Sequence, residues 1–277
     1  MCIIIGVFGG GDAVGRVIFV TSFKGGVGKT TVTANLAASL AVMGKRVMIV
    51  DGDFGMRCMD MVLGLQSDAI YNACDVLTGV CTVNEAKVAH CSGADFIAAP
   101  MGAYETTIPK TAFFKLFRHL RELYDYIFID SSTEQSPYYL AFAAAADDAL
   151  VVAMHRSTAI RAAEKTAYAL SGLGFRNLRL IVNCYDRALA ESGALPNLYQ
   201  IIKRSAVRLL GVVPVDGRLV EWQEKGVTVL SPEREKDRYL SESEIAFLNI
   251  AKRMTGMAVP LLDGVYDVKI KRKKLKL

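Results

Sequence analysis

A glycine-rich run with two lysines is the part of the sequence best suited to bind phosphate. It lies between the apolar segment 17–20 and the helix-compatible stretch 32–43, and it reads Lys24-Gly25-Gly26-Val27-Gly28-Lys29-Thr30-Thr31. Glycines let backbone N–H groups wrap around an anion, while Lys29 can reach β- and γ-phosphates and the Thr30 hydroxyl can hold Mg²⁺. The run therefore predicts a nucleotide-binding loop that uses Mg²⁺.

The loop departs from the usual G-x-x-x-x-G-K-[ST] spacing at one position. Phe23 stands where that pattern has glycine, and a second lysine, Lys24, opens the loop. The form K-G-G-x-G-K-T-T resembles the deviant Walker A motif of the MinD/ParA family of ATPases. This resemblance implies that the nucleotide is ATP, that ATP joins two copies into a homodimer, and that Lys24 reaches the phosphates bound by the partner subunit.

Two carboxylates follow the next apolar strand. Asp51 and Asp53 come directly after residues 46–50, where they could position water and support Mg²⁺, or could only cap the following helix. The segment 51–60 resembles switch I of the MinD branch of the family. The resemblance implies a role in hydrolysis for Asp53 and a Mg²⁺-linked role for Asp51. Cys58 replaces the asparagine common in that branch, so a dimer contact by that asparagine is not expected here.

Another apolar run, 126–129, ends in Asp130 and has the form of a Walker B strand. The carboxylate of Asp130 is expected to orient the water shell of Mg²⁺. The family continues with a glycine near the γ-phosphate, but this chain has Glu134 at that position. A negative side chain there would repel phosphate unless the loop turns it away, so slow or altered turnover is expected.

Two further strand ends resemble the adenine-binding segments of the family. Asn183 follows the apolar run 180–182, and Pro214 follows another, 212–213. The resemblance implies that Asn183 and Pro214 contact the base. An asparagine at a strand end is also a common turn residue, and the arginine that usually follows in the family is replaced by Cys184.

The elements that must position these residues alternate between strands and helices. The hydrophobic pattern predicts strands over 16–22, 46–51, 94–99, 126–130, 148–154, 178–183 and 209–213, and helices over 32–43, 110–123, 157–171 and 196–205. Thr82 with Glu85 and Ser241 with Glu244 have the spacing of capping boxes. We therefore expect an α/β fold of three layers, in which helices flank a mostly parallel twisted sheet, as in P-loop NTPases. The phosphate loop and the carboxylates should meet at the carboxyl edge of this sheet.

The bulk properties favour one cytosolic domain. A chain of 277 residues with 52% hydrophobic content can bury a large core, and no apolar stretch reaches membrane-spanning length. Six cysteines without C-x-x-C spacing indicate reduced thiols. Residues 16–258 are predicted to form the ATPase domain, and residues 1–15, which lack a basic region typical of signal peptides, a leader or an extra edge strand.

The remaining residues, 259–277, form a basic tail. It holds six of the 33 basic residues of the chain: Lys269, Lys271, Arg272, Lys273, Lys274 and Lys276. Such a tail either stays solvated or adds about 1 kcal/mol of attraction per basic residue near an anionic membrane. Two tails in a dimer would hold a membrane better than one.

These features lead to one functional prediction with two alternatives. The chain is expected to be a MinD-like ATPase that dimerises on ATP, acts with protein partners in placing the division septum, and works in the cytoplasm or peripherally on the inner face of the cell membrane. The first alternative is a ParA-like partition ATPase acting on DNA. The second is a scaffold that binds ATP but scarcely hydrolyses it, because of Glu134.

Overall fold

The central element is an eight-stranded sheet in the order β3-β4-β2-β5-β1-β6-β7-β8. The computed structural model describes residues 14–102, 107–231 and 239–262. The strands are β1 Arg16–Thr21, β2 Val47–Gly52, β3 Val88–Ala89, β4 Asp95–Ile97, β5 Tyr126–Ser131, β6 Asp148–Met154, β7 Leu178–Tyr185 and β8 Arg208–Pro214. Seven of these strands are parallel, and the short β3 pairs antiparallel with β4 at one edge.

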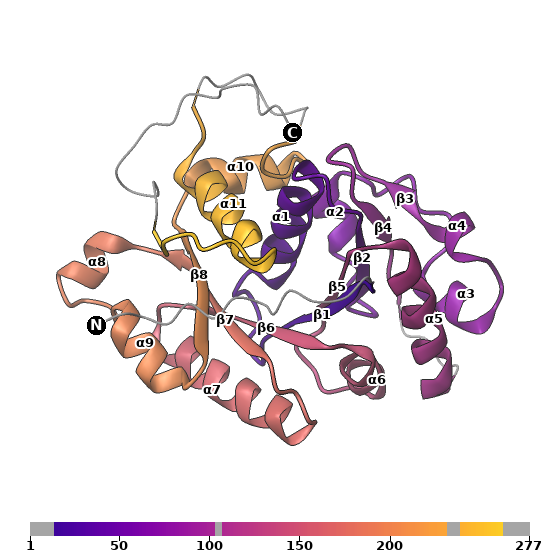
Figure 1. Ribbon diagram of the computed structural model, residues 1–277, viewed down its shortest axis with the longest axis horizontal. Helices are drawn as coiled ribbons and strands as arrows, with labels where there is room; N and C mark the ends of the chain where they lie inside the picture. Colours follow the sequence, from indigo (N-terminus) through magenta and orange to yellow (C-terminus); the bar gives the residue numbers. More distant parts are fainter. Residues whose placement is uncertain (1–13, 103–106, 232–238, 263–277) are drawn as a thin grey trace.

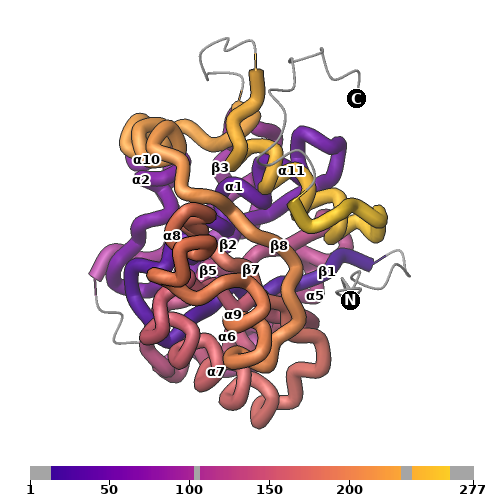
Figure 2. Tube along the Cα trace, turned by 90° about the vertical axis from the view of Figure 1, so that its left-hand side faces the viewer, coloured from indigo at the N-terminus to yellow at the C-terminus, as the bar shows by residue number. Residues whose placement is uncertain are grey.

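Helices cover both faces of the sheet, which makes three layers (Figures 1 and 2). One face packs against α1 Lys29–Val42, α2 Met59–Leu63, α10 Gly217–Glu224 and α11 Glu242–Met254. The other face packs against α3 Ala73–Thr78, α4 Val83–Ala86, α5 Lys110–Leu123, α6 Pro137–Ala145, α7 Ser157–Gly172, α8 Arg187–Glu191 and α9 Leu198–Ser205. The predicted three-layer α/β fold is confirmed.

Strand register brings the carboxylates of the sequence analysis together. Asp51 of β2 lies opposite Asp130 of β5, and β5 in turn pairs with β1, which leads into the glycine-rich loop. Because parallel strands end at the same edge, one edge of the sheet collects residues from segments a hundred positions apart. The seven predicted strands match β1, β2 and β4 to β8 within two residues at each end.

The helices that the pattern did not predict are short or buried. Helix α6 begins with Pro137 after the Ser136 cap, and its apolar run Tyr138–Ala145 lacks a polar face. A helix buried on most sides shows no amphipathic period, so the pattern gave no signal. Helix α11 begins at the predicted capping box of Ser241 and Glu244, and the box of Thr82 and Glu85 begins α4.

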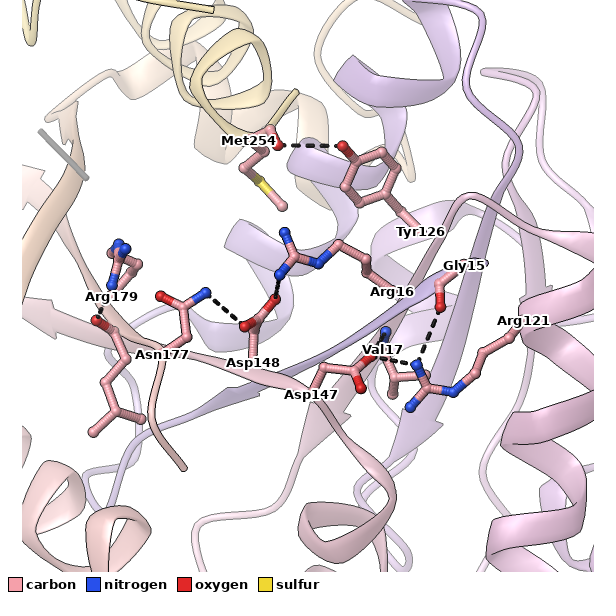
Figure 3. A network of polar contacts seen from close by, with 11 residues as sticks. Gly15, Arg16, Val17, Arg121, Tyr126, Asp147, Asp148, Asn177, Arg179 and Met254 are labelled. Atoms are coloured by element: carbon pink, nitrogen blue, oxygen red, sulfur yellow. Dashed lines mark hydrogen bonds and ion pairs between the residues drawn. The ribbon is translucent and has the colours of Figure 1, made fainter. Parts of the chain in front are cut away.

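A polar network joins elements at the opposite edge of the sheet, where the strands begin (Figure 3). Arg121 of α5 bonds to Asp147 and to the carbonyl oxygen of Gly15, and Asp147 accepts from the backbone N–H of Val17. Next to it, Arg16 pairs with Asp148 at 3.1 Å, and Asn177 donates to the same carboxylate. This network fixes β1 against β6 and α5 far from the glycine-rich loop.

Arg253 anchors the root of the C-terminal tail. Its buried guanidinium donates to the carbonyl oxygens of Leu210, Val259, Pro260 and Leu261. Leu261 and Leu262 pack against the core, so the chain is held to the body through residue 262. The expected leader over 1–15 lies almost entirely outside the described residues, as does the basic part of the tail. In the described part of the chain, no helix is both long and apolar enough to cross a membrane.

Candidate functional site

The glycine-rich loop has the conformation needed to wrap an anion. Gly26 and Gly28 adopt φ angles of 70° and 88°, which residues with a side chain rarely adopt. Helix α1 starts directly afterwards at Lys29, with no side chain bonded to its first N–H groups and no acidic residue in its first turn. These N–H groups and the positive end of the helix dipole are therefore free to bind phosphate.

Asn183 supports the glycine-rich loop by a hydrogen bond from its side chain to the backbone of the loop. Its side chain is buried, and its Nδ2 donates to the carbonyl oxygen of Val27 at 3.0 Å. A Cβ on Gly28 would lie 2.2 Å from the same Nδ2, so only glycine fits there. The Oδ1 atom is buried without a hydrogen-bond partner in the described ranges. The structure thus gives Asn183 a role in holding the loop, and its contact with adenine stays a prediction.

Asp130 is held by two threonines of α1. Thr30 Oγ1 donates to its Oδ2 at 2.7 Å, and Thr33 Oγ1 shares its proton between Oδ1 of Asp130 at 3.1 Å and the carbonyl oxygen of Lys29 at 3.0 Å. Burial raises the pKa of Asp130 to about 6, against the opposing effect of Thr30, Lys29 and Thr33. Thr33 was missed by the sequence analysis, although its position one turn after Thr30 places both hydroxyls on one helix face.

Asp51 lies beside Asp130 and is fully buried. Its Oδ1 accepts from the backbone N–H of Asp53 at 3.0 Å, and its Oδ2 accepts from the N–H of Met59 at 3.4 Å. Burial, followed by the charge of Asp130, raises the pKa of Asp51 well above its ordinary value. Asp51 therefore ties the end of β2 to the start of α2, within the segment 51–60 that resembles switch I.

Asp53 and Glu134 face the same region from two different loops. Burial raises the pKa of Asp53, Lys29 opposes this effect, and the charge of Glu134 adds to it. Glu134 itself is exposed, and its backbone carbonyl accepts from the hydroxyl of Ser132. Glu134 thus acts through its charge on Asp53, the residue predicted to take part in hydrolysis.

Phe54, in the segment 51–60, makes aromatic contacts with α6, the helix that follows the loop containing Glu134. The ring of Phe54 lies 5.0 Å from that of Tyr138 and 5.4 Å from that of Phe142, between ring centroids. This contact was not predicted, because aromatic residues 84 or more positions apart carry no local signal of their pairing. It packs the segment after β2 against the helix that follows residue 134.

The two remaining predicted site residues are Lys24, in the glycine-rich loop, and Pro214, at the end of β8. Lys24 is half-buried and forms no ion pair within the described ranges, and its backbone N–H donates weakly to Ser22 at 3.4 Å. Pro214 ends β8 opposite Tyr185, at the same sheet edge as the loop. The reach of Lys24 into a partner subunit and the contact of Pro214 with the base stay predictions.

The donor set suits Mg²⁺. The hydroxyl of Thr30 and the carboxylates of Asp130 and Asp51 are hard oxygen donors within one site, and Mg²⁺ prefers oxygen ligands while keeping several waters. Together with Lys29 and the N–H groups of α1, they form a site for the phosphates of a Mg²⁺-bound nucleotide.

Comparison with known proteins identifies relatives along most of the chain. The family model described as AAA domain matches residues 15–173. The septum site-determining protein MinD of Synechocystis is 34% identical over 250 residues, which cover 90% of this chain and 92% of that protein. The structure of the MinC:MinD cell division protein complex of Aquifex aeolicus has a TM-score of 0.80, 30% identity and coverage of 89% of this chain and 98% of that one. MinD from Pyrococcus horikoshii, solved with Mg-ADP, has a TM-score of 0.74, 27% identity and coverage of 86% and 94%.

Proposed function

Because this chain belongs to the MinD family of cell-division P-loop ATPases, we propose that it hydrolyses ATP and uses ATP binding to join two copies into a dimer. Binding of nucleotide and Mg²⁺ is consistent with the relative solved with Mg-ADP. The dimer would be the form that assembles with other division proteins, and hydrolysis would release it.

The observation that carries this proposal is the hydrogen bond of Thr30 to Asp130 under the uncapped start of α1. The bond supports the proposal because the Thr30 hydroxyl, the Asp130 carboxylate and the charge of Lys29 lie close together, and these groups would hold Mg²⁺, order its water shell and attract phosphate. Bound Mg²⁺ would supply charge stabilisation for the transferring phosphate. Lys29 and the N–H groups of α1 would hold the phosphates, and Asp53 would orient the attacking water.

The dimer proposal depends on Lys24. Its ammonium group has no acidic partner in the described part of the chain, so it can pair with phosphate contributed by another subunit. Substitution of this lysine should abolish dimerisation but not ATP binding, because Lys29 would still bind ATP within one subunit.

The test measures molecular mass by light scattering after gel filtration with a non-hydrolysable ATP analogue and Mg²⁺. The wild type should become dimeric, Lys24→Ala should bind the analogue but stay monomeric, and Lys45→Ala, three residues beyond the end of α1, should behave as wild type. A wild type that stays monomeric when saturated with the analogue contradicts the proposal.

We also propose that the tail brings the dimer to an anionic membrane and that a division protein binds the dimer. The basic residues over 269–276 support the first point. The second follows from the relative that forms a complex of MinC and MinD. Glu134 supports a second candidate function, a nucleotide-dependent scaffold with little turnover, since its negative charge acts on Asp53, the residue proposed to orient the attacking water. Dimerisation without measurable phosphate release would favour the scaffold.

A further inference from the structure

A hydrogen bond between Thr31 and Gln223 joins the phosphate loop to a distant helix. Thr31 Oγ1 donates to Gln223 Oε1 at 2.6 Å, and Gln223 lies on α10, 192 residues later in the chain. Both side chains are half-buried. Neither the fold nor the proposed reaction requires this bond, and sequence analysis did not identify Gln223.

The bond occupies the only proton of the Thr31 hydroxyl. Thr31 is in the first turn of α1, among the residues expected to bind phosphate. A hydroxyl has one donor and two lone pairs, so one that donates to Gln223 presents only lone pairs to its other neighbours. Lone pairs repel a phosphate oxygen, and Gln223 therefore competes with phosphate for the same proton.

A second bridge keeps the segment 223–229 close to this turn. The Asn35 side chain is buried, its Nδ2 donates to the carbonyl oxygen of Thr31 at 2.7 Å, and its Oδ1 accepts from the N–H of Val229 at 2.7 Å. Asn35 thus links the first turn of α1 to residue 229, six residues after Gln223.

The same segment touches switch I through α2. The backbones of Gly226 and Gly64 are in contact, since a Cβ on Gly226 would lie 2.4 Å from the Cα of Gly64. Gly64 ends α2, whose first residue, Met59, donates its N–H to Asp51. Figure 2 shows α10 beside α2, and the two helices are in contact.

We propose that Gln223 is a positioning residue that acts through Thr31: it withholds the Thr31 hydroxyl from phosphate and so lowers nucleotide affinity, and nucleotide binding breaks this bond. The segment 223–229 then senses occupancy of the phosphate loop and lies against α2. This inference rests on the proposed function, because it assumes that the loop binds ATP and ADP.

The test compares dissociation constants of fluorescent ATP and ADP analogues with Mg²⁺. Gln223→Leu removes the acceptor and should tighten binding about 3- to 10-fold, whereas Gln223→Glu offers a stronger, charged acceptor and should weaken it. If Gln223→Leu does not fold, as judged by thermal unfolding, Gln223→Met replaces it with a side chain of similar length.

A double-mutant cycle separates the proposed route from a general effect on α10 or on local charge. In a Thr31→Val background, both substitutions of Gln223 should leave affinity within about two-fold of Thr31→Val alone. Equal or weaker binding by a folded Gln223→Leu protein, or effects that persist in the Thr31→Val background, would overturn the inference. Failure of the proposed function looks different, because the wild type itself would then bind neither analogue.

Discussion

Thr30 and Asp130 are a hundred residues apart in the chain, and a hydrogen bond of 2.7 Å joins the hydroxyl of the first to the carboxylate of the second. The bond links the start of α1 to the end of β5, and Thr33 holds the other oxygen of the same carboxylate. Through this carboxylate, the helix proposed to bind phosphate and the strand proposed to support Mg²⁺ are joined by hydrogen bonds.

The pKa of Asp130 predicts how binding depends on pH. Burial raises this pKa to about 6, so the carboxylate becomes neutral below that pH and loses its attraction for Mg²⁺. Mg²⁺-dependent nucleotide binding should therefore weaken as pH falls through about 6. Thr33→Val removes a hydrogen bond that favours the charged form, and it should move the midpoint upward by roughly half a pH unit. Titration of binding between pH 5 and 8 checks this, and an unmoved midpoint contradicts it.

The same pKa predicts a stability effect without nucleotide. A carboxyl group whose folded pKa lies above its unfolded value contributes stability that is present below the unfolded pKa, about 3.8, and is lost as pH rises through about 6. Asp130→Asn should remove this loss, so the difference in unfolding free energy between variant and wild type should shift in favour of the variant between pH 4 and pH 7. Urea denaturation at several pH values measures it, and a difference independent of pH would show that Asp130 does not titrate there.

Gly28 should be far less tolerant of substitution than Gly44. Both have positive φ angles, but a Cβ on Gly28 would collide with Asn183, whereas nothing lies within 4 Å of a Cβ on Gly44. Gly44→Ala should cost only the backbone strain, about 1 kcal/mol. Gly28→Ala should cost about 2 kcal/mol or more and weaken nucleotide binding at least 10-fold. Thermal unfolding and nucleotide titration of the two variants compare these effects directly.

Replacement of Glu134 should speed ATP turnover. Its charge helps to raise the pKa of Asp53, and the sequence resemblance leads us to expect glycine at its position. Glu134→Gly should raise the rate of phosphate release several-fold, and Glu134→Gln, which removes only the charge, should give part of that gain. Gln135→Gly is the control for added loop flexibility. A rate no higher than wild type in Glu134→Gly would show that the loop already keeps this carboxylate away from phosphate.

Removal of residues 263–277 should abolish ATP-dependent pelleting with anionic vesicles. The cut follows residue 262 because Leu261 and Leu262 pack against the core and Arg253 bonds to the carbonyl of Leu261. With about 1 kcal/mol per basic residue, two tails of six are needed for firm attachment. Lys165→Ala combined with Lys203→Ala lowers the net charge elsewhere and should pellet as wild type. If the truncated protein pelleted with the vesicles as wild type does, the tail would not be needed for membrane binding.

Several features of this protein were predictable from the sequence, because they depend on residues close together in the chain. The glycine-rich loop, the seven strands and the capping boxes of α4 and α11 are local patterns of glycine, apolar and capping residues. The placement of Asp51 beside Asp130 also followed, since parallel strands end at one edge of the sheet.

Other features were decided only by the tertiary structure. The hydrogen bonds of Thr33 to Asp130, Asn183 to Val27 and Thr31 to Gln223 join side chains 97 to 192 residues apart. No local pattern encodes such pairs, because they arise from the packing of helices on a sheet. The pKa of Asp130 has the same origin: the carboxylate is buried under α1, and desolvation there favours its neutral form.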